Sequence, residues 1–374
     1  MKKVYLDNAA TTQLRPEVIL EITRVLTEEF GNPSSTHSFG RSARNIIELS
    51  RKTIAKALNA AAQEILFTSG ATEANNWILQ AAVTDLAVRR IITSKVEHHA
   101  VLHAVERLAL QHGIRVDYVR ILPDGAVDLT DLVTLLSDKT PTLVSLMHVN
   151  NETGATIDLG AIGRICRQHG AYFHSDTVQS VGKSLLDLQQ LPIDFIVASA
   201  HKFHGPKGVG FAFIRKGLVV QPLFFGGEQE KGLRPGTEAV HNIAGMAKAL
   251  EISLGQLEAE QTYIADLRQY ASEQIMQQFS GTKINSSPTG FYNILNVSLP
   301  LSADQAEMLL FRLDMKGIAI SRGSACQSGS AKPSHVLAEM LTDDDLRKTG
   351  IRISFSHYNT REDIDLLIGA LLPV

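Results

Sequence analysis

Short apolar runs alternate with helix-like stretches from about residue 64 to residue 215, and this alternation constrains the fold more than any other feature of the chain. The apolar runs cover 64–68, 90–94, 115–121, 142–149, 171–175, 194–198 and 208–214, and most are followed by a stretch of helical periodicity. Such alternation is typical of an α/β fold with a mainly parallel central sheet flanked by helices. In such sheets ligands bind outside the carboxyl ends of the strands, so the residues after each run are the first candidates for a site.

The chain beyond this region has a different pattern. Apolar residues stay in helical register over 242–279, which predicts one unusually long helix. Strand patterns then cover 293–299, 318–321 and 351–355, and helical patterns cover 303–316, 334–341 and 360–372. We predict a large α/β domain over 14–256 and a smaller α+β domain made of 1–13 and 257–374, with the long helix as the connector.

The charge and the cysteine content limit which binding partners and which cellular compartment we expect for the protein. The 36 lysines and arginines nearly balance 39 aspartates and glutamates, which gives no reason to expect nucleic acid or an anionic membrane as the partner. No apolar stretch is long enough to span a membrane. The two lysines at the start are not followed by the apolar stretch of a secretory signal. Two cysteines rule out a disulfide framework and favour a cytoplasmic location. The 13 histidines have no metal-ligand spacing, so we expect no bound metal.

The segment 68–73, with sequence TSGATE, is a turn of small residues between a predicted strand and a predicted helix. Unpaired N–H groups and the positive end of the helix dipole make such a turn suitable for a phosphate group. The hydroxyls of Ser69 and Thr72 would add donors. An ordinary helix cap is the alternative interpretation.

Two charged residues follow neighbouring strands. Asp176 comes directly after the run 171–175, and Lys202 follows the run 194–198. A carboxylate and an amine at one sheet edge, next to a phosphate site, are what pyridoxal 5′-phosphate requires. Lys202 would bind the aldehyde as a Schiff base, and Asp176 would keep the pyridine nitrogen protonated. A buried Asp–Lys ion pair is the alternative. His98 follows another strand and could stack on a flat ring or transfer a proton.

The two cysteines have different surroundings. Cys326 lies in a segment rich in Gly and Ser, about 321–333, where a thiol near Arg322 is suited to act as a nucleophile. An incidental surface cysteine is the alternative. Cys166 lies on the apolar side of a predicted helix, and we expect it to be an inert core residue.

Several segments together resemble the cysteine desulfurases of the NifS/IscS type, within the class V aminotransferase family of fold-type I pyridoxal phosphate enzymes. The matching segments are 5–12, 31–35, 68–76, 149–154, 174–179, 199–206, 232–238 and 323–326. The resemblance covers nearly the whole chain. It implies conversion of L-cysteine to L-alanine, with the sulfur held as a persulfide on Cys326 and passed to an acceptor protein, such as a scaffold for iron–sulfur clusters.

The resemblance also implies roles for individual residues. The residues expected to bind the cofactor are Ala71, Thr72, His98, Asn151, Asp176, Gln179, Ser199, His201 and Lys202. Thr237 would complete the phosphate site from the other subunit of a homodimer. Asn151 and Arg352 would bind the substrate carboxylate, and Lys202, Cys326 and His98 would be the catalytic residues.

Three other functions remain open on the sequence: a selenocysteine lyase, a class V aminotransferase, and a binding protein without activity. The chain also departs from the family pattern. Arg322 stands where a small residue is common, Glu228 replaces a glycine, and the segment 354–357 after Arg352 is altered.

Overall fold

The central sheet has seven strands in the order β2-β8-β7-β6-β5-β3-β4. The computed structural model describes residues 2–301, 303–322 and 334–372. The strands are β2 (Ile65–Thr68), β3 (Arg90–Thr93), β4 (Arg115–Tyr118), β5 (Thr142–Ser145), β6 (Tyr172–Asp176), β7 (Phe195–Ser199) and β8 (Gly210–Ile214). β3 to β7 pair in parallel, and β8 runs antiparallel to both of its neighbours. The predicted class, a mainly parallel central sheet flanked by helices, is confirmed, and each of the seven predicted strands is present.

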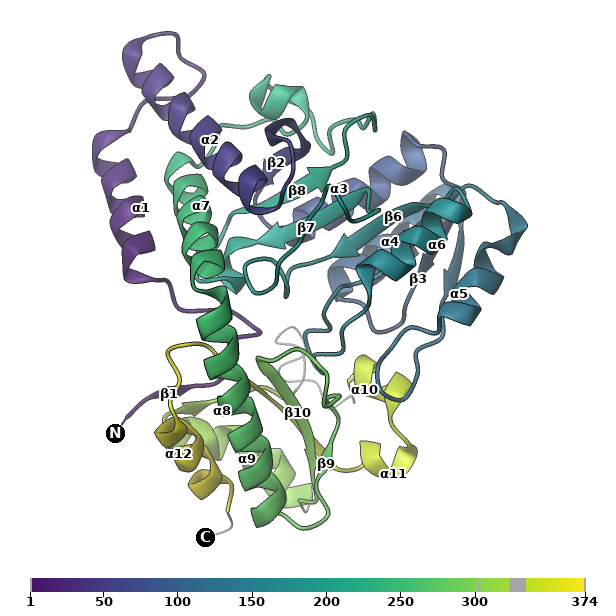
Figure 1. Ribbon diagram of the computed structural model, residues 1–374, viewed down its shortest axis with the longest axis vertical. Coiled ribbons are helices and arrows are strands. Elements are labelled where there is room, and N and C mark those ends of the chain that lie inside the picture. The colour runs from purple at the N-terminus through teal and green to yellow at the C-terminus, as the bar shows by residue number, and fades with distance from the viewer. Residues whose placement is uncertain (1, 302, 323–333, 373–374) are drawn as a thin grey trace.

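Helices cover both faces of this sheet (Figure 1). They are α1 (Pro16–Glu28), α2 (Ser38–Ala57), α3 (Ala71–Thr84), α4 (His99–His112), α5 (Leu129–Leu135) and α6 (Leu159–Gln168), with the 3₁₀ turns Ala62–Glu64, Leu136–Asp138, Ala200–Lys202 and Gln229–Gly232. Strand residues alternate between two apolar clusters, because successive side chains of a strand point to opposite faces. On β7, Phe195 and Val197 pack with α3 and α4, whereas Ile196 and Ala198 pack with α1, α2 and α6.

The long helix predicted over 242–279 is two helices, so that prediction was wrong in detail. α7 (Val240–Gly255) ends at Gln256, where φ is −109° and ψ is 7°, and α8 (Leu257–Gln278) begins directly afterwards. Gly255 stands just before the break, and glycine is a poor helix former. Figure 1 shows the two helices following one another along the molecule.

Two smaller sheets lie below the central sheet, and β10 (Ile294–Leu299) and β9 (Lys283–Ile284) run beside α8 (Figure 1). β1 (Val4–Tyr5) pairs in parallel with β11 (Ile318–Ala319), and β10 lies between β9 and β12 (Thr349–Ser354). The remaining helices are α9 (Ala303–Met315), α10 (His335–Met340), α11 (Asp343–Leu346) and α12 (Arg361–Leu371). One apolar cluster joins α8, α9 and α12 to these strands and includes Val4 and Leu6 from the start of the chain. The predicted domain boundaries stay a prediction.

Among the described residues, no helix combines the length and apolar character needed to cross a membrane.

Candidate active site

A cavity of about 510 Å³ opens at the carboxyl ends of β6 and β7. The predicted site residues that line it are Ala71, Thr72, His98, Asn151, Asp176, Gln179, Ser199, His201, Lys202 and Arg352. Thr237 is exposed and does not line the cavity of its own chain. Cys326 lies outside the described residues. The structure therefore brings together every predicted site residue that it describes except Thr237.

Asp176 is the last residue of β6, and its side chain is buried. Its Oδ2 accepts a hydrogen bond of 2.8 Å from Nδ2 of Asn75, and its Oδ1 accepts one of 3.1 Å from the Val178 N–H. Asn75 lies one turn into α3 and is fully buried. Both partners are neutral donors, and they fix the orientation of the carboxylate without neutralising its charge.

Lys202 lies in the 3₁₀ turn that follows β7. Its Nζ donates to the carbonyl oxygens of Ala9, at 2.6 Å, and Ala10, at 2.9 Å. Both acceptors come from the N-terminal segment. The strand end thus places the amine in the cavity, and the start of the chain holds it there.

The turn before α3 has glycine at its N-cap. Gly70 has φ 155° and ψ 178°, a backbone conformation that is almost restricted to glycine, and no side chain caps the helix. The first N–H groups of α3, at Ala71 and Thr72, have no acceptor within the helix. The arrangement has the free N–H groups that a phosphate site needs, and the phosphate site stays a prediction.

The Ser69 hydroxyl, expected as a phosphate donor, has a different partner. It donates to Oε2 of Glu73 at 2.5 Å, and the Ser69 N–H donates to the same oxygen at 3.0 Å. Arg234 also binds Glu73 through two hydrogen bonds of 2.8 and 3.0 Å. Burial raises the pKa of Glu73, but the bonds from Arg234 and Ser69 outweigh it, so the pKa lies below its usual value.

His98 caps α4 at its N-terminus. Its Nδ1 accepts a hydrogen bond of 3.1 Å from the Ala100 N–H, which places the proton of the neutral ring on Nε2. Burial lowers the pKa of His98, and the nearby Asp176 opposes that shift. The imidazole is therefore neutral near pH 7, with a donor at Nε2.

Gln179 and His201 lie beside the lysine. Gln179 donates from Nε2 to the Ala9 carbonyl at 2.9 Å, and its Oε1 is 3.4 Å from Nζ of the buried Lys183. Burial and the neighbouring Lys202 lower the pKa of Lys183 to about 7. The same two causes, with further lysines, lower the pKa of His201 to about 3, so this ring is neutral as well.

Arg352 forms the opposite end of the cavity. It lies on β12 with 1% of its side chain exposed. Its Nη2 is 2.7 Å from Oδ1 of Asp7, and its Nη1 donates to the Asn151 carbonyl at 2.9 Å. Nε is buried and has no hydrogen-bond partner among the described residues. Arg352 and Asn151, which were predicted to act together, are thus in direct contact.

The sequence analysis missed several residues of the site. They are Asp7, Asn75, Lys183, Lys207 and Arg234. Asn75 and Arg234 lie inside segments that carry the family resemblance, and their positions there were the available signal. Asp7 lies in such a segment too, but nothing in the sequence indicates its partner.

Comparison with known proteins shows which family the chain belongs to. A family model described as aminotransferase class-V matches residues 4–367. The chain belongs to this family. The resemblance found in the sequence is therefore confirmed at the family level.

Relatives in this family are similar over nearly their whole length. A protein named cysteine desulfurase IscS from Dictyoglomus turgidum is 40% identical over 99% of this chain and 94% of its own length. A cysteine desulfurase from Cereibacter sphaeroides is 39% identical over 100% of this chain and 96% of its own. Among solved structures, a NifS-like protein has a TM-score of 0.91 at 37% identity, covering 99% of this chain and 98% of its own. SspA in complex with cysteine has a TM-score of 0.82 at 31% identity, covering 96% and 100%.

Proposed function

We propose that this protein is a pyridoxal 5′-phosphate-dependent cysteine desulfurase, which converts L-cysteine to L-alanine and holds the sulfur as a persulfide on Cys326. The observation that carries this proposal is the presence of Asp176, Lys202 and the uncapped start of α3 in one cavity. The relatives named cysteine desulfurase support the reaction, and the structure of SspA with cysteine supports the substrate.

The residues of the cavity fit the proposed cofactor. The buried Asp176 carboxylate has two neutral donors as its partners and suits a cationic ring nitrogen. The first N–H groups of α3 and the helix dipole suit a phosphate group. The half-buried His98 ring supplies a flat surface, and Lys202 supplies an amine. Gln179, Ser199, His201 and Asn151 complete the proposed contacts.

Pyridoxal 5′-phosphate supplies an aldehyde carbon and a ring that withdraws electrons from the α-carbon of an amino acid. In our proposal, Lys202 accepts the α-proton at Nζ. His98 holds a proton at Nε2 and exchanges it with the substrate thiol. Asp176 would hold the ring nitrogen through its carboxylate.

Arg352 and Asn151 bind the carboxylate of the substrate in this proposal. The Cys326 thiolate attacks the sulfur of the bound cysteine, so that a new S–S bond forms and the Cβ–S bond breaks. The electron pair stays with the carbon, which takes up a proton to give L-alanine. A sulfur-acceptor protein then removes the persulfide sulfur, for example for iron–sulfur cluster assembly. A cytoplasmic location is part of the same proposal.

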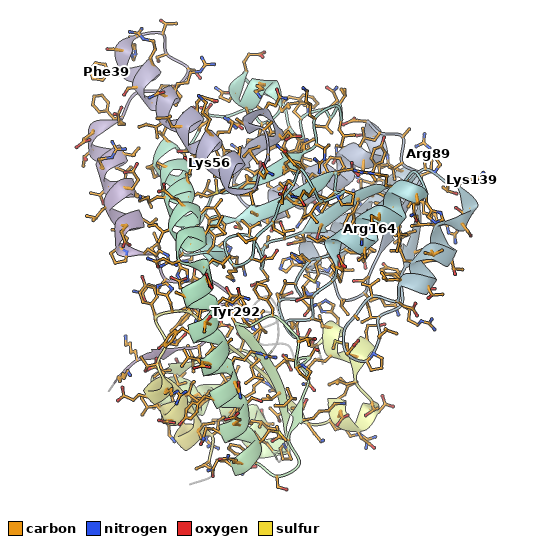
Figure 2. All side chains as sticks on the ribbon, viewed as in Figure 1. Phe39, Lys56, Arg89, Lys139, Arg164 and Tyr292 are labelled. Atoms are coloured by element: carbon orange, nitrogen blue, oxygen red, sulfur yellow. The ribbon has the colours of Figure 1, made fainter. Side chains whose placement is uncertain are left out.

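We also propose a homodimer in which Thr237 reaches the cavity of the partner subunit. Thr237 is exposed in its own chain, away from its own cavity. Exposed apolar side chains on α1, after α1 and at the start of α2 favour a subunit interface on this part of the surface. Leu20 is 69% exposed and Phe30 is 74% exposed, and Phe39, at the upper end of α2 in Figure 2, packs on Phe30 with ring centroids 5.3 Å apart.

The test is a turnover experiment with the cofactor-loaded protein, L-cysteine and no added reductant. We expect alanine and protein-bound persulfide in equal amounts, and loss of both in Cys326→Ala. Cys166→Ala is the matched control, since the buried Cys166 packs in the core. Sulfide release at an unchanged rate by Cys326→Ala would show that the nucleophile is another group. Amino-group transfer, or activity only with selenocysteine, would establish one of the alternative functions.

A further inference from the structure

The N-terminal segment contacts both ends of the cavity. Its Ala9 and Ala10 carbonyls accept from Nζ of Lys202, and its Asp7 carboxylate lies 2.7 Å from Nη2 of Arg352. Arg352 and Asp7 are 345 residues apart in the sequence. One short segment therefore holds the amine at one end and the guanidinium at the other.

The position of Asp7 is fixed by hydrogen bonds that its neighbours Leu6 and Ala9 make on two sides. The Ser354 N–H donates to the Leu6 carbonyl at 2.8 Å, and the Ala9 N–H donates to the Ser354 hydroxyl at 2.8 Å. On its other edge, the Leu6 N–H donates to the Ala319 carbonyl at 2.9 Å. Asp7 is thus paired with Ser354 of β12, and Ser354 lies two residues from Arg352 on that strand.

We propose that Asp7 is a positioning residue, which holds the guanidinium of Arg352 in the orientation that accepts the substrate carboxylate. This inference rests on the proposed function and names one more residue of the same site. It concerns orientation: Asp7 does not touch the substrate in this proposal, and it acts through Arg352.

The contacts of the guanidinium favour this role. The side chain of Arg352 is 1% exposed, and its Nη2 lies 2.7 Å from the Asp7 carboxylate, which fixes where that nitrogen points. However, the ion pair uses one nitrogen and one oxygen, whereas a fully committed arginine and carboxylate bind through two parallel hydrogen bonds. The buried Nε has no partner among the described residues, and each terminal nitrogen has a second N–H. Donors therefore remain for a second carboxylate while Asp7 keeps the group in place.

Two conservative variants separate position from charge. Asp7→Asn keeps an oxygen in place to accept from Nη2 and removes the negative charge. Asp7→Glu keeps the charge and moves the carboxylate by one methylene. If orientation is what Asp7 supplies, Asp7→Glu raises KM for L-cysteine by about tenfold or more, because small displacements in a binding site have effects of this size. We expect kcat to change by less than about twofold in this variant, and KM of Asp7→Asn to stay within about threefold of the parent value.

Binding is measured separately from turnover, by titrating the absorption of the cofactor-loaded enzyme with L-alanine, which has the same carboxylate. The Kd for L-alanine should follow KM in each variant. Asp117→Glu and Asp117→Asn are the matched controls. Asp117 pairs with the buried Arg90 and is 18% exposed, close to the 17% of Asp7, and it does not line the cavity. Neither control should change KM or Kd.

An unchanged KM and Kd in Asp7→Glu overturns the inference. An equal rise in both Asp7 variants overturns it as well, because the charge rather than the position would then be what matters. A fall in kcat alone, or a rise in KM that both Asp117 controls share, also contradicts it. Failure of the proposed function is distinguishable, since the parent enzyme would then form no alanine from cysteine.

Discussion

Glu97 is a buried carboxyl group directly before His98. Its Oε1 accepts hydrogen bonds from the Ser94 hydroxyl, at 3.0 Å, and the Met147 N–H, at 2.8 Å. Oε2 has no partner in the described part of the chain. Burial raises the pKa of Glu97 to about 8, and the nearby Asp176 adds to this shift. The group is therefore protonated in the folded protein at pH 7.

This proton makes stability depend on pH. Between the usual pKa of 4.5 and about 8, folded Glu97 keeps a proton that the unfolded chain releases, so its contribution to the free energy of unfolding falls as pH rises. Glu97→Gln cannot titrate. From pH 5.5 to pH 7.5, we expect the free energy of unfolding of Glu97→Gln to improve relative to the parent by on the order of 2 kcal/mol.

Denaturant unfolding at the two pH values measures this difference. Glu106→Gln, a substitution of an exposed residue on α4, is the control and should leave the pH dependence unchanged. A difference between Glu97→Gln and the parent that is the same at both pH values would contradict the prediction.

For single residues, the sequence pattern predicts which side chains follow strands, but it does not predict their hydrogen-bond partners. Asp176 and Lys202 could be identified because buried runs precede them, and Ala71 and Thr72 because a turn of small residues opens a helix. The hydrogen bonds of these residues could not be identified from the sequence. The Ser69 hydroxyl was expected to face a phosphate but donates to Glu73, since the carboxylate four residues later lies on the same side of the first helical turn.

At the scale of elements, the start of α3 depends on Gly70. At φ 155° an added side chain is strained, and its Cβ would lie 3.5 Å from the Ser199 hydroxyl. We expect Gly70→Ala to lower stability by about 1–3 kcal/mol and to weaken cofactor retention, because the first N–H groups of α3 would shift.

Absorption near 420 nm after dialysis measures retention of the cofactor. Gly113→Ala is the matched control, since Gly113 has φ 63°, ends α4 and has no atom within 4 Å of an added Cβ. It should cost about 1 kcal/mol of stability without loss of cofactor. Equal retention in the two variants would show that the turn before α3 does not need this conformation.

The elements themselves follow well from the sequence where hydrophobic periodicity is strong. All seven strands of the central sheet were predicted for this reason. α1 was not predicted, although Pro16 at its first turn is a helix-start signal. The break at Gln256 was missed, because apolar residues continue in register through it.

At the scale of the whole molecule, Arg15 ties the start of α1 to the junction of α7 and α8. Its Nη2 lies 2.8 Å from Glu260, and its Nη1 donates to Gln256 Oε1 at 3.0 Å. Glu260 lines a small cavity together with Tyr292, which is labelled near the middle of Figure 2. The arginine is almost fully buried. Its contacts with Glu260 and Gln256 connect the region around the larger sheet to the region around the smaller sheets.

Arg15→Met should lower the free energy of unfolding by on the order of 2 kcal/mol, because it leaves the partly buried Glu260 without its cation. Urea unfolding measures the loss. Arg24→Met is the comparison, since Arg24 pairs with Glu21 at the surface and should contribute less than about 0.5 kcal/mol. Equal losses would mean that the Arg15 bonds contribute no more than a surface pair.

The overall arrangement was only partly predictable. An α/β region and a second region with mixed elements follow from the patterns, but the antiparallel β8 does not, because strand direction is set by connections and packing rather than by periodicity. Contacts between the two ends of the chain cannot be predicted from local sequence patterns either.

The N-terminal segment that lies between β11 and β12 has a consequence for biosynthesis. Residues 4–10 are synthesised long before the strands that hold them, near residues 318 and 354. The nascent chain can form its central sheet early, yet the guanidinium end of the cavity cannot assemble until β11 and β12 have been synthesised. A chain interrupted before β12 therefore lacks Arg352 and with it the guanidinium end of the cavity.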